Sequence, residues 1–138
     1  MNAESRGMRA RQILPWTLFL YFATSLLHFA HNAEFLTQYP NLPPSWSRSD
    51  VYFAWCFLAT VGIAGYISYA RHRSGIGLTL LALYAGLGLG GLLHYTRAPL
   101  LSHSLMMNTT IWAEAVTASV LLANLAFLCR RASRSTQG

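Results

Sequence analysis

The sequence contains no lysine and few charges of any kind. Of its 138 residues 10% are charged and 54% are apolar, whereas an ordinary soluble domain is about 25% charged. The two cysteines, Cys56 and Cys129, stand in apolar segments and form no CxxC motif. This composition excludes a chain whose whole surface faces water. The cysteines indicate neither a disulfide framework nor a thiol redox site.

Four long apolar runs account for most of the chain. A helix needs about 20 mostly apolar residues to span a membrane, and four segments meet this length. They predict an all-α integral membrane four-helix bundle, antiparallel and up-down-up-down, in a single domain covering residues 1–138. The first run exceeds the 7–15-residue core of a signal peptide and no A-x-A site follows, so we expect a retained helix. The predicted helices cover 13–33, 51–70, 75–95 and 108–129, and short basic tails cover 1–11 and 131–138.

The arginines predict the orientation of this bundle. A net charge of +6 would also suit nucleic acid, but the arginines lie at the edges of apolar segments, which is typical of positive-inside topology. Eight arginines lie in the two tails and in the short connection between the second and third runs. Only Arg48 and Arg97 lie in the two longer connections, 34–50 and 96–107. We therefore expect both termini in the cytoplasm of a bacterial cell, the protein in its inner membrane, and no nucleic-acid partner. The 34–50 and 96–107 loops would then lie on the periplasmic face.

Small and aromatic residues predict how the helices pack and where the membrane ends. Small side chains let helices approach closely in lipid, and tryptophan and tyrosine gather at membrane interfaces. Stripes of small residues predict a tight bundle, and they would also allow a homo-oligomer. The stripes are Ala82, Gly86 and Gly90, then Ala115, Ser119 and Ala123, with Gly62 and Gly65; the predicted interface residues are Trp16, Tyr39, Trp46 and Tyr95.

A group of polar residues interrupts the apolar pattern near one membrane face. The stretch LLHFAHNAEF, residues 26–35, holds two histidines at the end of the first helix. At ~1.5 Å of rise per residue, topology brings His28, His31, His94 and Glu114 to a similar level in the outer leaflet. A charge at bilayer depth costs ~3 kcal/mol or more, so Glu114 is expected to face the bundle and to have partners.

This cluster suggests a ligand site, most simply a metal site. Imidazoles and a carboxylate suit zinc, copper or iron, so we predict His28, His31, His94 and Glu114 as the metal-binding residues. A b-type haem held by His94 and a helix-one histidine is a variant. His103 and Glu34 are weaker candidates, and Asn32, Asn108 and Trp112 are candidate pocket residues.

Three short motifs resemble the EXPERA-type family of small membrane proteins. They are LYF in the first helix, PPSW before the second, and WAEAVTAS in the fourth. The resemblance implies a helix bundle around a sterol-sized pocket lined by acids, which would bind a small hydrophobic ligand or isomerise it. Glu114 would match a pocket glutamate, and His28 or Glu34 a polar group of the first helix. In that case Glu114 and His28 are the candidate catalytic residues.

A structural or accessory subunit without chemistry is the remaining alternative. Its polar groups would fix the helix register and would satisfy one another through hydrogen bonds. An enzyme would instead need a roomy pocket beside Glu114. The sequence does not decide among metal, lipid-like ligand and scaffold, and it does not fix the oligomeric state.

Overall fold

The computed structural model describes residues 3–135, with side chains described from Met8 to Arg131. This part of the chain is mostly helical and contains no strand. The helices are α1 (Ala3–Glu34), α2 (Arg48–Ala70), α3 (Ser74–Gly88), α4 (His94–Arg97) and α5 (Leu105–Ser135), with 3₁₀ turns η1 (Leu36–Gln38), η2 (Leu89–Leu93) and η3 (Leu100–Ser102).

Four stretches of the described residues are long and apolar enough to cross a membrane, which confirms the predicted all-α class and the number of candidate spans. They are Met8–Glu34, Arg48–Ala70, Ser74–Arg97 and Leu105–Arg131. The third span joins α3, η2 and α4 without leaving a helical backbone, because the residues on both sides of η2 have right-handed helical dihedral angles.

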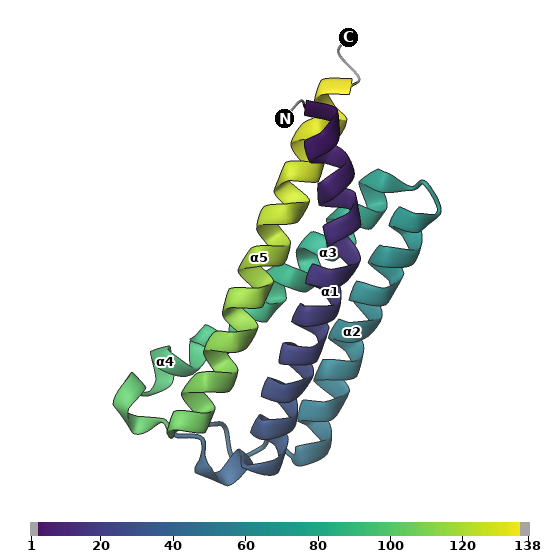
Figure 1. Cartoon of the computed structure of the whole chain (residues 1–138). Coiled ribbons are helices and arrows are strands. Elements are labelled where there is room, and N and C mark those ends of the chain that lie inside the picture. Colours follow the sequence, from purple (N-terminus) through teal and green to yellow (C-terminus); the bar gives the residue numbers. More distant parts are fainter. Residues whose placement is uncertain (1–2, 136–138) are drawn as a thin grey trace.

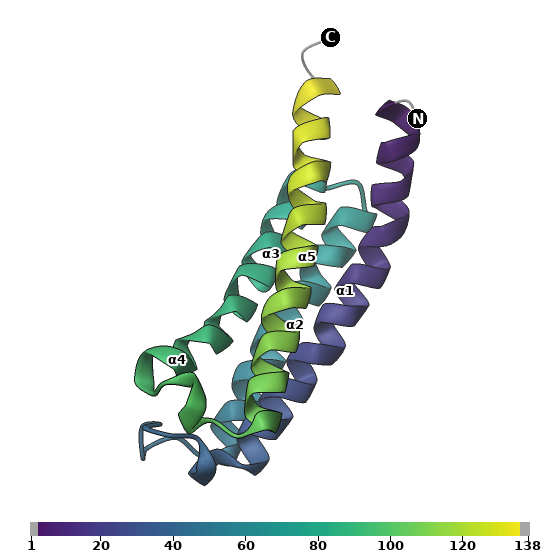
Figure 2. The same ribbon diagram turned by 60° about the vertical axis from the view of Figure 1, so that its left-hand side comes forward.

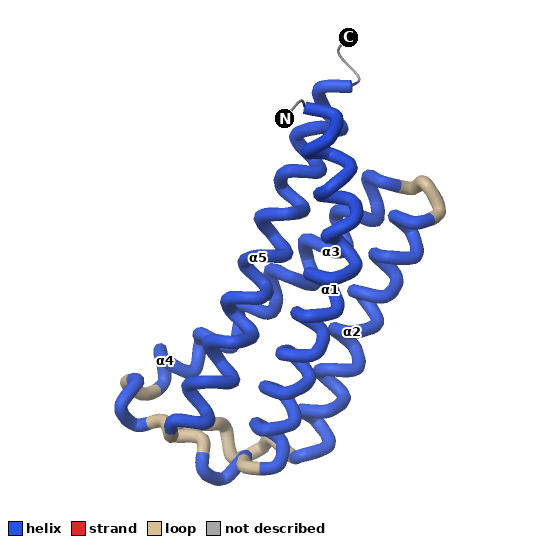
Figure 3. Tube along the Cα trace, viewed as in Figure 1, coloured by secondary structure: helices blue, strands red, loops and turns tan. Residues whose placement is uncertain are grey.

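The helices form a closed ring in which α1 packs on α2 and α5, and α3 packs on α2 and α5 (Figures 1 and 2). The α2–α3 turn lies towards the end of the bundle where α1 begins and α5 ends, which we call the terminal end. The two longer connections, 35–47 and 98–104, lie at the opposite end, which we call the loop end (Figure 3). Successive spans are therefore antiparallel.

The first and last helices are longer than the apolar runs suggest. Helix α1 begins at Ala3 and α5 continues to Ser135, so the predicted tails, 1–11 and 131–138, are largely helical. Residues 1–2 and 136–138 of those tails lie outside the described residues. An apolar count finds the membrane-buried part of a helix and misses a polar extension that continues the same backbone hydrogen bonds.

Helix α2 begins earlier than predicted because Ser47 caps it. The backbone N–H of Asp50 donates to the Ser47 hydroxyl at 3.3 Å, and the Asp50 carboxylate accepts from the backbone N–H of Ser47 at 2.9 Å. This reciprocal arrangement is a capping box.

Only some of the predicted small-residue positions lie where two helices approach closely. A Cβ at Gly62 would lie 2.6 Å from the Tyr84 ring, and one at Gly65 would lie 3.0 Å from Leu81, so α2 approaches α3 closely there. At Gly86 and Gly90 no atom lies within 4 Å of the position a Cβ would take. The predicted stripe on the third span is therefore wrong for these two glycines within a single chain.

Candidate functional site

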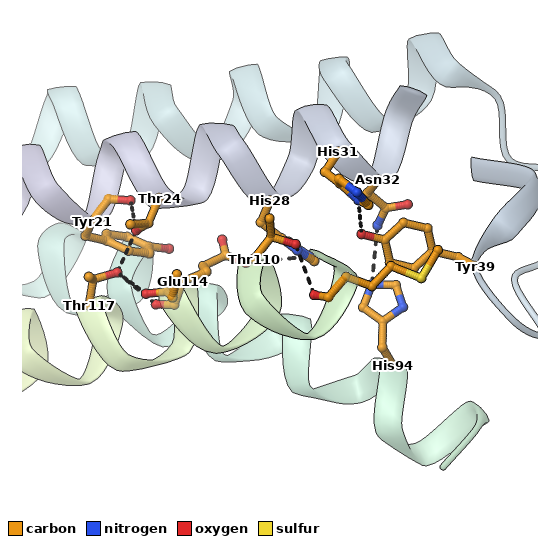
Figure 4. Close-up of polar contacts among 12 residues, drawn as sticks. Tyr21, Thr24, His28, His31, Asn32, Tyr39, His94, Thr110, Glu114 and Thr117 are labelled. Carbon is orange, nitrogen blue, oxygen red and sulfur yellow. Dashed lines mark hydrogen bonds and ion pairs between the residues drawn. The ribbon is translucent and has the colours of Figure 1, made fainter. Parts of the chain in front are cut away.

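A buried polar cluster lies in the half of the bundle next to the loop end. Its side chains come from α1, from the first loop, from α4 and from α5 (Figure 4), and the second loop adds His103. The structure brings together His28, His94 and Glu114, as their predicted depth suggested. The other members of what we call the polar cluster are Asn32, Tyr39 and His103.

Glu114 and His28 form the centre of this cluster. The Glu114 Oε2 lies 3.7 Å from the His28 Nε2, and the two side chains are 1% and 3% exposed. Gly91 makes this pair possible, because a Cβ there would lie 3.1 Å from Glu114 Oε2 and 3.5 Å from His28 Nε2. The carboxyl group thus sits against bare backbone of η2.

His94 links this pair to the loop end. Its ring contacts the His28 ring edge-on, with centroids 5.6 Å apart, and the Tyr39 ring at 4.9 Å. The His94 Nε2 lies 3.3 Å from the side-chain nitrogen of Asn32. Residues of α1 and of the first loop therefore hold this imidazole in place.

His103 joins the cluster from the second loop. It is 6% exposed, and its ring centroid lies 6.2 Å from that of His94. Its Nδ1 lies 3.1 Å from the Pro99 carbonyl oxygen, which fixes Nδ1 as the donor. Sequence reading gave His103 a minor place because a loop histidine has no helical register to aim it.

Asn108 supports the loop that carries His103. Its side-chain nitrogen donates to the carbonyl oxygens of Leu100 and His103 at 3.2 and 3.3 Å, and its Oδ1 accepts from the Tyr95 hydroxyl at 2.8 Å. The other predicted pocket residue on α5, Trp112, is 47% exposed and stacks near Tyr95.

His31 and Tyr39 form a second polar pair above His94. The His31 Nδ1 lies 2.9 Å from the Tyr39 hydroxyl. Tyr39 was predicted to lie at the membrane interface, but its side chain is buried, and this burial raises its pKa to about 12. Its ring covers His94 on the side of the loop end.

Glu34 lies apart from the polar cluster. Its Oε1 accepts from the Arg48 guanidinium at 2.6 Å and from the Tyr52 hydroxyl at 2.7 Å, and all three groups lie on the exposed surface between α1 and α2. The structure thus places Glu34 in a surface ion pair.

The polar cluster ends below Glu114, towards the terminal end. There the rings of Tyr21 and Tyr84 pack at 4.6 Å, and the Tyr21 hydroxyl donates to the Tyr84 carbonyl oxygen at 3.0 Å. Beyond them α1, α3 and α5 form the main apolar core, which includes Leu14, Leu81, Leu121 and Leu125. An uncharged pair, Thr17 with Asn124, links α1 to α5 there. A second pair, Thr24 with Thr117, links the same helices on the loop-end side of Tyr21.

Several buried polar atoms of the cluster have no hydrogen-bond partner among the described residues. They include ring nitrogens of the three clustered histidines and both oxygens of Glu114: His28 Nδ1, His94 Nδ1, His103 Nε2, Asn32 Oδ1, Glu114 Oε1 and Glu114 Oε2. An unsatisfied buried group costs about 1–3 kcal/mol. Such groups concentrated in one place are expected where a ligand supplies the missing interactions.

Across the part of the chain that the structure describes, no group of three or more His, Cys, Asp or Glu residues could hold a metal ion as the side chains stand. No family model, curated protein or solved structure matches this chain. The EXPERA-type resemblance therefore stays a prediction from the sequence.

Proposed function

We propose that this chain is an integral membrane protein that binds a transition-metal ion through His28, His94 and His103, with Glu114 as charge partner. One observation carries the proposal. Each of the three buried imidazoles has one ring nitrogen against a neighbouring polar group and the other nitrogen without a partner. Histidines that bind metals have this division, because the second nitrogen is oriented by a carboxylate, a carbonyl or water.

The protonation states follow from these neighbours. The Nδ1–H of His103 donates to the Pro99 carbonyl oxygen, which leaves a lone pair on Nε2. Glu114 favours a proton on His28 Nε2, which leaves the lone pair on Nδ1. For His94 the same result requires the Asn32 amide to present its oxygen, and amide orientation is assigned from hydrogen bonding rather than observed.

The donor set indicates the ligand class. Neutral imidazoles suit zinc, copper, iron and nickel. The Glu114 carboxylate would supply one negative charge to a cation in a bundle where an isolated charge is costly. The three rings must turn about their side-chain bonds to converge, because no three side chains hold a metal in the present arrangement.

The proposed ligands are fewer than the candidate metal ligands and cofactors predicted from the sequence. His31 is already bonded to Tyr39, and Glu34 to Arg48, so neither is included. Haem is not included either, because the His28 and His94 rings contact each other directly and leave no layer between them for a porphyrin.

The apolar core beneath the cluster supports a site with one opening. Tyr21 and Tyr84 separate Glu114 from the terminal end, so an ion would reach the site and leave it through the loop end. The arginine distribution favours the outer face of the membrane for that end. Because the site would open at one end only, we favour binding or sensing of the ion over its transport across the membrane.

Metal titration tests the proposal directly. Protein purified with a tag that lacks histidine would be titrated with Zn²⁺ by calorimetry and with Co²⁺ by absorption spectroscopy. We expect one ion per chain, loss of binding in His94→Ala, and at least about tenfold weaker binding in His103→Ala. The control is His72→Asn, because His72 is exposed in the α2–α3 turn and asparagine tolerates its positive φ of 61°.

Glu114→Gln separates the metal proposal from a scaffold. The amide keeps the shape of the carboxyl group, so we expect a folded protein that binds Zn²⁺ about 10–100-fold more weakly. Failure of the wild-type protein to bind Zn²⁺, Co²⁺ or Cu²⁺ would contradict the proposal. If Glu114→Gln then also lowered the melting temperature, the cluster would be a structural network.

A further inference from the structure

The surface of α3 carries a groove that has no part in the polar cluster. The groove has a volume of about 680 Å³ and runs along the membrane-spanning part of α3, from Ser74 to Leu87, with Cys129 of α5 at its edge. Its floor consists largely of small residues, among them Gly75, Ala82 and Gly86. We propose that this groove binds one acyl chain of a phospholipid whose anionic headgroup lies at the α2–α3 turn.

The length of the groove matches one leaflet of a bilayer. At ~1.5 Å of rise per residue, Ser74 and Leu87 lie about 20 Å apart along the helix. The hydrocarbon core of a bilayer is about 30 Å thick, so one leaflet supplies about 15 Å. The groove begins at the end of the span and extends slightly past the middle of the membrane, so a lipid chain of one leaflet fits along it.

The charge at the mouth of the groove favours an anionic headgroup. Arg71 and Arg73 are exposed in the turn that leads into Ser74. The α3 N-cap is Arg73, which makes no side-chain cap hydrogen bond, so the first backbone N–H groups of a 15-residue helix remain for an anion. The sequence has no acidic residue between Asp50 and Glu114 to compensate these charges.

The same charges argue against a second copy of the chain as the occupant. A symmetric dimer through this face, with its axis along the membrane normal, would bring Arg71 and Arg73 of both copies to the same depth. Like charges at close range repel one another, whereas a phosphate group would neutralise them. The proposal does not depend on metal binding in the polar cluster.

Gly86 allows a test that does not disturb the fold. No atom lies within 4 Å of the position of a Cβ at Gly86 or at Gly90, and both residues are exposed, so a side chain can start at either position without a clash. Gly86 lines the groove and Gly90 does not. Gly86→Leu should fill the groove, and Gly90→Leu is the matched control with the same change one turn away.

Native mass spectrometry in detergent measures the outcome, with phosphatidylglycerol and phosphatidylcholine of identical chains as probes. We expect the wild-type protein and Gly90→Leu to retain one phosphatidylglycerol in preference to phosphatidylcholine. Gly86→Leu should lose this lipid, and the double variant Arg71→Gln, Arg73→Gln should bind phosphatidylglycerol at least about tenfold more weakly, because each arginine at the surface attracts anionic lipid.

Any of three results would overturn the proposal. The first is equal binding of both lipids by the wild-type protein, and the second is equal binding of phosphatidylglycerol by the two leucine variants. The third is a wild-type dimer that Gly86→Leu converts to a monomer, which would identify a second copy as the occupant. Melting temperatures of the two leucine variants, measured together, confirm that both are folded.

Discussion

Glu114 is the residue around which the polar cluster is organised. It is 1% exposed, its oxygens make no well-formed hydrogen bond among the described residues, and its polar neighbours are His28 and the buried hydroxyl of Ser25. A buried carboxyl group with few hydrogen bonds is destabilising, and proteins keep such groups mainly at functional sites. The long distance of 3.7 Å to His28 leaves this pair able to tighten when a cation arrives.

Gly91 gives a test of the cluster at the scale of one methyl group. A Cβ there would lie 3.1 Å from Glu114 Oε2, so Gly91→Ala should push the carboxyl group away from His28 and weaken Zn²⁺ binding about tenfold. Gly90→Ala adds the same methyl group where no atom lies within 4 Å, and it should bind like the wild-type protein. Calorimetric titration of both variants with Zn²⁺ is the measurement, and equal affinities would separate Gly91 from the site.

Sequence reading found the residues of the cluster that lie on helices. His28, His94 and Glu114 follow from helix rise and topology, because both are nearly fixed within a membrane span. The sequence did not predict that His103 lies beside His94 or that Tyr39 is buried. Their positions depend on how two irregular loops fold over the bundle, which no periodic pattern records.

At the scale of elements, the 3₁₀ segment η2 decides where His94 points. An α-helix turns by 100° per residue and a 3₁₀-helix by 120°, so five residues of η2 turn the chain about 100° further than an α-helix would. Gly88 and Gly91 flank or lie in this segment where a Cβ would crowd Tyr21 and Glu114, respectively, and glycine weakens an α-helix. A continuous helix was the natural expectation from the apolar run, and the structure instead rotates His94 towards His28.

The two loops are joined to each other above the site. The side-chain nitrogen of Asn41 donates to the Arg97 carbonyl oxygen at 2.8 Å, and Arg97 donates back to the Asn41 carbonyl oxygen at 3.5 Å. Asn41 has a φ of 58°, a left-handed conformation that asparagine and glycine adopt more readily than other residues. We call this contact the loop clip, and it helps hold the loops together near Tyr39.

Asn41→Gly removes the side-chain half of the loop clip without straining the backbone. A neutral hydrogen bond contributes ~1 kcal/mol, so we expect bound Zn²⁺ to dissociate about fivefold faster into excess chelator. The equilibrium affinity should change less than the rate, because no metal ligand is altered. Stopped-flow chelation measures this rate. An unchanged rate would show that ions do not pass between the two loops.

At the scale of the whole molecule, the bundle has two unlike halves. Between α1, α3 and α5 the terminal half holds an apolar core closed by Tyr21 and Tyr84, and the loop half holds the polar cluster. The four apolar runs predicted the helical spans well, because a membrane requires internally satisfied backbone over a fixed length. The groove on α3 could not be predicted, since the same glycines were equally consistent with packing inside the bundle.

X-ray absorption at the zinc edge tests the central proposal most directly. The wild-type protein would be loaded with Zn²⁺ and dialysed, and the bound metal would be examined beside His72→Asn and His94→Ala. We predict nitrogen neighbours at about 2.0–2.1 Å with the outer-shell scattering of imidazole rings, retained in His72→Asn and lost in His94→Ala. Protein that keeps no zinc, or zinc surrounded by oxygen without imidazole scattering, would contradict a metal site in the polar cluster.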